Sequence, residues 1–132
     1  MTRITDKIDE INKYLDELYS IFPDDFNDYR DNLEKKAACE RYYEKILEAV
    51  VDLAFLIIKF KRLKMPDDES HAFIVLLKAD IIDEKLCNKL QEAKGMRNFL
   101  VHQYDKTDDL LVFEVIHDEL RKDVEMFISK IF

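Results

Sequence analysis

The stretch "ILEAVVDLAFLIIKF", residues 46–60, decides the fold. Apolar side chains occupy most sides of this segment when it is drawn as a helix, so it should be the most buried helix of the molecule. A period near 3.6 residues extends upstream to about Asp28, through Leu33, Ala37, Tyr43, Leu47, Val50, Ala54 and Ile57. We therefore predict one long helix over about 28–64, which the rest of the chain must cover.

The segment before this helix is amphipathic. Over residues 4–22 the apolar positions alternate in steps of four and three, the pattern of a helix packed on neighbours; they are Ile4, Ile8, Ile11, Leu15, Leu18 and Phe22. Pro23 follows directly and cannot continue the helix. A first helix is therefore predicted over 4–22.

Three further helices are predicted after the loop "KMPDDES", residues 64–70. Ser70 is a suitable N-cap for a short helix over 71–78. Asp80, Asp83 and Glu84 mark the start of another helix, and a last one begins at about Asp109. The expected fold is all-α: a single domain over residues 1–132, built as an antiparallel helical bundle of four main helices plus one short helix.

Composition narrows the class of protein. One Gly and two Pro in 132 residues leave little sequence for tight hairpins. The longest apolar run, residues 53–58, is far shorter than a membrane span, and the N-terminal "TRITDKIDE" is not a signal peptide. Cys39 and Cys87 lack metal-ligand spacing and are expected to be reduced thiols. We expect a cytoplasmic protein with no membrane association. The net charge of −8 argues against broad binding to nucleic acid but leaves room for a small local RNA site.

The candidate functional residues are concentrated in "EAKGMRNFLVHQYDK", residues 92–106, where Arg97 and His102 bracket an apolar run. Phosphate-binding glycine loops, paired metal ligands and a serine nucleophile motif are missing from the sequence. Five helical positions separate the two side chains by about 140°, whereas Arg97 and Tyr104 share a face. Arg97 and His102 therefore meet within one subunit only if the helix ends near Val101 or His102. Otherwise a partner subunit must complete the site.

These residue types suit metal-independent cleavage of a phosphodiester assisted by the ribose 2′-hydroxyl. Arginine holds phosphate, histidine transfers protons near neutral pH, and Asn98 adds a neutral amide. A purely structural alternative stays open, in which Arg97 pairs with Glu92 or Asp105 and His102 caps the helix. The apolar residues 99–101 are interpreted as the anchor that holds the helix end in the core.

The motif "MRNFLVHQYDKTDD", residues 96–109, resembles that of the HEPN superfamily, in its HepT-like toxin branch. Arg97, Asn98, His102 and Tyr104 match that pattern residue by residue, and the resemblance extends over about 33–132. It implies a homodimer whose two subunits line a shared cleft, acting as the endoribonuclease toxin of a toxin–antitoxin system.

The same resemblance assigns roles to the matching residues, with no cofactor and no metal. Arg97 would bind the scissile phosphate, His102 would transfer protons and Asn98 would orient the site. A minimal nucleotidyltransferase antitoxin would silence cleavage of RNA by transferring AMP to Tyr104. The alternative is a non-catalytic helical interaction module that this partner binds and modifies. Gly95 would permit a close approach by another backbone or a substrate, or is simply tolerated on an exposed face.

Overall fold

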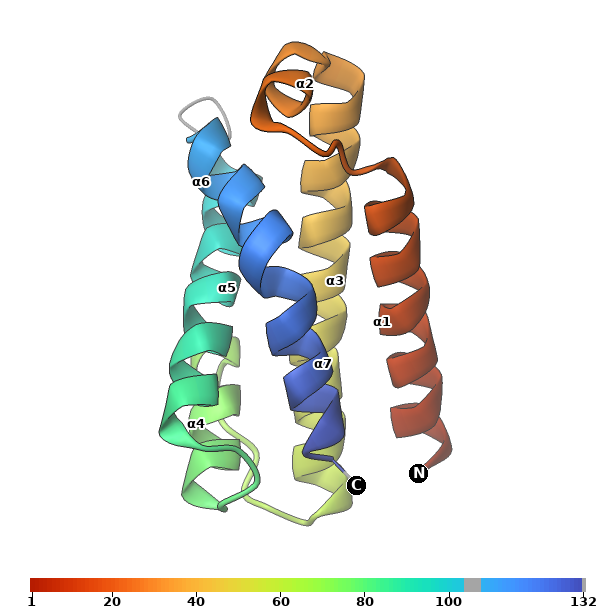
Figure 1. The fold of residues 1–132 in the computed structure, drawn as a ribbon. Coiled ribbons are helices and arrows are strands. Elements are labelled where there is room, and N and C mark those ends of the chain that lie inside the picture. Colours follow the sequence, from red (N-terminus) through yellow and green to blue (C-terminus); the bar gives the residue numbers. More distant parts are fainter. Residues whose placement is uncertain (104–107, 132) are drawn as a thin grey trace.

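The computed structural model describes residues 1–103 and 108–131, and within them every regular element is helical. Four long rods form the bundle, and consecutive rods run in opposite directions (Figure 1). The rods are α1 (Thr2–Ile21), α3 (Leu33–Phe60), α5 (Glu84–Gln103) and the continuous run α6 (Asp109–Val115), η3 (Ile116–Leu120) and α7 (Arg121–Ser129). The predicted all-α antiparallel bundle is confirmed.

Helix α3 is the centre of the core. It lies between α1 and α5 in Figure 1, and its buried side chains are spread around the helix rather than along one stripe. These are Cys39, Tyr43, Ile46, Leu47, Ala49, Val50, Val51, Leu53, Ala54, Ile57 and Ile58. The prediction that residues 46–60 form the most buried helix is confirmed.

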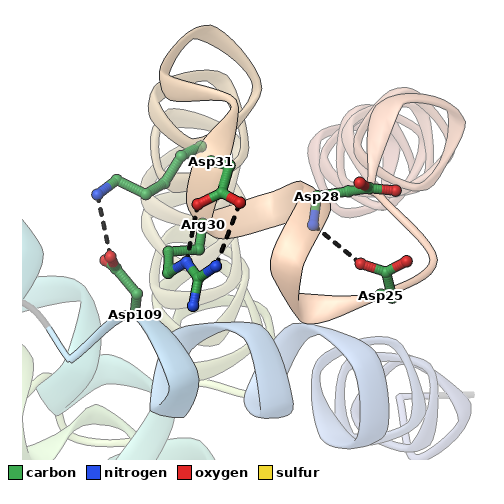
Figure 2. A network of polar contacts seen from close by, with 6 residues as sticks. Asp25, Asp28, Arg30, Asp31 and Asp109 are labelled. Atoms are coloured by element: carbon green, nitrogen blue, oxygen red, sulfur yellow. Dashed lines mark hydrogen bonds and ion pairs between the residues drawn. The ribbon is translucent and has the colours of Figure 1, made fainter.

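The prediction of one helix over 28–64 is wrong, because the helix is interrupted at Asn32. A short helix, α2 (Phe26–Asp31), precedes the break, and α3 begins after it. The extended backbone of Asn32 lets its side chain accept a hydrogen bond from the Lys35 amide at 3.0 Å, which caps α3. Asp25 caps α2 in the same way, at 2.9 Å from the Asp28 amide (Figure 2). The structure therefore holds two short helices, α2 and α4, where one was predicted.

The short helix after the loop starts differently from the prediction. A 3₁₀ turn, η1 (Glu69–His71), leads into α4 (Ala72–Lys78), so Ser70 is not an N-cap. The Ser70 hydroxyl instead donates to Asp68 at 2.5 Å. The start of α5 follows the prediction, since Asp83 accepts from the Leu86 amide at 2.8 Å.

The last helix begins as predicted, with Asp108 accepting from the Leu111 amide. One wide π-turn, η3, interrupts it, and such turns leave a backbone carbonyl without its usual helical donor. The Tyr19 hydroxyl on α1 donates to the Ile116 carbonyl, which ties this turn to the first helix.

The C-terminal end of α5 and the start of α6 lie at the same end of the bundle as α2, opposite both chain termini (Figure 1). Lys36 on α3 and Asp109 on α6 form an ion pair at 3.1 Å, with both side chains one-quarter exposed. Figure 2 shows Asp109 facing the corner between α2 and α3, near the Arg30–Asp31 ion pair. The start of α6 is thus fixed to the start of the central helix.

Both cysteines are free thiols, as predicted. Both are also buried, and burial raises the pKa of the Cys39 thiol to about 11. In the part of the chain that the structure describes, no helix is both long and apolar enough to cross a bilayer.

Candidate functional site

Helix α5 continues through Gln103, so it does not end or distort before His102. The condition for Arg97 and His102 to meet within one subunit is therefore not fulfilled. On a regular helix their side chains point about 140° apart. Arg97 faces the η1 turn of its own chain and is largely covered, whereas His102 is exposed.

Arg97 is held by a residue far away in sequence. Its Nη2 donates to Oε2 of Glu69 at 3.1 Å, and the Arg97 side chain is only 11% exposed. Its Nε is buried and has no hydrogen-bond partner among the described residues. The structural alternative is thus realised in part: Arg97 does pair with a carboxylate, but the carboxylate comes from η1 and not from Glu92. Asp105 lies outside the described residues.

The η1 turn is fixed against α5 by more than this ion pair. Gln91 on α5 donates from Nε2 to the Ser70 carbonyl at 3.0 Å. Within the turn, hydrogen bonds from Ser70 and His71 lower the pKa of Asp68 to about 2. The turn and the Arg97 side of α5 therefore form one assembled unit.

Asn98 and Gly95 lie on the side of α5 that carries His102. Asn98 is one turn before His102 and Gly95 two turns before it, which places all three within about 60° on the helix. Asn98 is half-buried and Gly95 exposed, and a Cβ built on Gly95 meets no atom within 4 Å. Packing against other parts of the chain therefore does not require a glycine here, and the space at the Gly95 position is open.

The apolar run does not anchor the helix as predicted. Leu100 is 2% exposed, but Phe99 and Val101 are 37% and 42% exposed. Successive helical residues point about 100° apart, so one side of a helix cannot bury three in a row. The core holds the end of α5 through Leu100 alone among these three residues.

Replacing Leu100 with alanine is expected to lower the free energy of unfolding by about 2–5 kcal/mol, the cost of a large-to-small change in a core. Val101→Ala should cost less than about 1 kcal/mol, because the Val101 side chain already faces solvent. Urea denaturation of the two variants measures the difference. Equal losses would contradict the assignment of Leu100 as the anchor.

Tyr104, the predicted acceptor of AMP, lies outside the described residues. The remaining histidines are exposed: His71 contacts Asp68 at 2.8 Å, and His117 contacts Asp118 at 2.6 Å. Over residues 1–103 and 108–131, no three His, Cys, Asp or Glu side chains cluster so as to hold a metal ion.

A mostly apolar cavity of about 260 Å³ lies between α5 and the α6–α7 rod, away from this site. Leu90, Met96 and Val115 are among its lining residues, and neither Arg97 nor His102 is. The Lys89–Glu119 ion pair, at 2.6 Å, joins α5 to η3 beside it.

Comparison with known proteins identifies the family. Residues 11–131 match the family model described as "Ribonuclease HepT-like". The chain therefore belongs to the ribonuclease HepT-like family, and the resemblance found in residues 96–109 is confirmed at the level of the family.

Individual relatives agree with this assignment. The chain is 29% identical to the tRNA nuclease HepT of Aphanizomenon flos-aquae over 119 residues, which cover 90% of this chain and 81% of the relative. It is 24% identical to the mRNA nuclease HepT of Shewanella oneidensis over 128 residues, covering 97% and 95%. The fold matches the tri-AMPylated S. oneidensis HEPN toxin in complex with MNT antitoxin, with a TM-score of 0.89, 24% identity and coverage of 97% and 95%.

Proposed function

We propose that this chain is the toxin of a toxin–antitoxin system, a metal-independent endoribonuclease with a single HEPN-like domain over residues 1–132. The main observation in support is that this chain, a member of the ribonuclease HepT-like family, presents Arg97 and His102 on two sides of one unbroken helix. The tRNA and mRNA nuclease relatives support RNA as the substrate class.

The site is proposed to form between two copies of the chain. Arg97 and His102 of one α5 cannot converge, because the helix between them is regular. In a two-fold dimer, the face of α5 that carries Gly95, Asn98 and His102 in one subunit would have to pack against the Arg97 side of the other, which would bring each His102 toward the Arg97 of the other subunit. The partner subunit thereby supplies what the geometry of a single α5 lacks.

In this site the ribose 2′-oxygen attacks phosphorus and the 5′-oxygen leaves. The products are a 2′,3′-cyclic phosphate and a 5′-hydroxyl. His102 moves a proton between these oxygens, Arg97 binds the phosphate and its developing charge, and Asn98 orients the groups. Two copies of Arg97 in one cleft also provide local positive charge on a chain whose net charge is −8.

The proposed partner is a minimal nucleotidyltransferase antitoxin, which acts on Tyr104. The Tyr104 oxygen would attack the α-phosphorus of a nucleoside triphosphate, release pyrophosphate and keep AMP. The complex of the AMPylated S. oneidensis toxin with its antitoxin supports this reaction. Tyr104 is two positions after His102 in the sequence, so the added nucleotide would block RNA by volume and by charge. We expect the pair to act in the cytoplasm.

Treatment with the antitoxin and ATP is expected to add one or more AMP units to the chain and to stop RNA cleavage. Tyr104→Phe should lose the mass increase and keep cleaving. Intact-mass spectrometry and a tRNA cleavage assay in EDTA measure the two effects. AMP addition by a chain that never cleaves RNA, modified or not, would favour the non-catalytic interaction module instead.

Gly95→Leu is expected to convert the homodimer to monomers while the helix content stays unchanged. A leucine side chain meets no atom of its own chain near the Cβ position but would fill the open face. Sedimentation and circular dichroism measure the two properties, with Glu48→Leu, at an exposed position of α3, as the control. A Gly95→Leu dimer as stable as the wild type would place the interface elsewhere.

A further inference from the structure

The carboxylate of Glu69 contacts the guanidinium of Arg97, a residue of the candidate site. Its Oε2 is 3.1 Å from Nη2 of Arg97, and its side chain is 54% exposed while that of Arg97 is 11% exposed. The guanidinium is thus held in place by burial, and the carboxylate is its solvent-facing partner. The sequence gives no hint of this contact, since 28 positions separate the two residues.

A carboxylate and a phosphodiester compete for a guanidinium because both are anions that accept hydrogen bonds from the same N–H groups. An N–H that donates to Glu69 is not available to a phosphate, and the Glu69 charge also repels one. A phosphate that binds Arg97 must therefore displace the carboxylate.

We propose that Glu69 is a competing carboxylate, which occupies Arg97 when RNA is absent and lowers the affinity of the site for a phosphate. This inference rests on the proposed function, in which Arg97 binds the scissile phosphate. The exchange needs no unfolding, because the Gln91–Ser70 hydrogen bond still holds η1 when the Glu69 side chain swings away. Glu69 acts through Arg97 and is a positioning residue, so it affects KM and leaves kcat unchanged.

The direct test is a titration with inorganic phosphate, followed by NMR at the Nε–Hε group of Arg97. Glu69→Gln is expected to lower the apparent Kd for phosphate about fivefold, the factor that an ion pair with one exposed partner typically represents. Asp67→Asn is the matched control: it removes one negative charge from the same exposed loop, and Asp67 makes no ion pair in the described part of the chain. Its Kd should stay within about twofold of the wild type. In tRNA cleavage, Glu69→Gln should lower KM about fivefold at constant kcat.

A Kd in Glu69→Gln that equals that of Asp67→Asn, or that rises, would overturn the competition. So would an Arg97 signal that phosphate does not move in any variant. Glu69→Asp, whose shorter side chain reaches Arg97 less well, should fall between wild type and Glu69→Gln, and it replaces Glu69→Gln if that variant misfolds. Failure of the proposed function is recognised separately, by RNA cleavage that persists in Arg97→Ala while the phosphate titration still follows the expected order.

Discussion

His102→Ala is expected to lower RNA cleavage by about 10²- to 10⁴-fold, the usual contribution of a positioned group that transfers protons. The exposed imidazole of His102 makes its removal inexpensive for the fold, so the free energy of unfolding should change by less than about 0.5 kcal/mol. Cleavage of tRNA in EDTA and thermal melting measure the two effects. This combination separates a catalytic role from a structural one, which would lower stability and activity together.

His117→Ala is the control for this result. His117 is also an exposed histidine on a helical rod, with 53% of its side chain accessible, and its contact is to Asp118. Its removal should leave cleavage within about twofold of the wild type, because His117 lies outside the motif of residues 97–104. Undiminished cleavage in His102→Ala, or an equal loss in His117→Ala, would contradict the assignment of His102.

The sequence predicted well those features that depend on neighbouring residues. The apolar period marked α1 and the buried part of α3, and the side chains of Asp83 and Asp108 cap the helices whose starts were expected near them. Each of these signals acts within one or two helical turns. They can therefore be recognised without knowledge of the tertiary structure.

The errors arose where local sequence allows two structures. Asn32 sits in the polar run "YRDNLEKK", residues 29–36, where an asparagine can cap a helix or lie on its exposed face. Ser70 was expected to cap a helix, but Asp68 takes its hydroxyl and a 3₁₀ turn forms. In the run of residues 99–101, hydrophobicity alone did not show that only Leu100 faces the core.

The Arg97–Glu69 ion pair could not be predicted from the sequence. It depends on how the turn before α4 packs against α5, a tertiary contact for which the chain carries no periodic or capping signal. Helical geometry did provide a useful constraint: positions 97 and 102 point about 140° apart on a regular helix, so a continuous α5 keeps Arg97 and His102 of one subunit apart. Since α5 does continue through His102, we propose that a second subunit completes the site.

A mixing experiment tests this shared site most directly. Homodimers of Arg97→Ala and homodimers of His102→Ala are each expected to be inactive. In a mixed dimer, one site combines both altered residues and the other combines two intact ones. After unfolding and refolding an equimolar mixture, half of the dimers should be mixed, so RNA cleavage should return to about one quarter of the wild-type rate.

The control for mixing is the double variant Arg97→Ala/His102→Ala refolded with wild-type chain. Its mixed dimers carry one altered residue in each site, so they should be inactive. The total rate then falls to about one quarter of that of an equal amount of wild-type dimer. Recovery of about a quarter of the activity from the two single variants is the result predicted by a site shared between subunits. No recovery, with mixed dimers demonstrated by mass spectrometry, would contradict it.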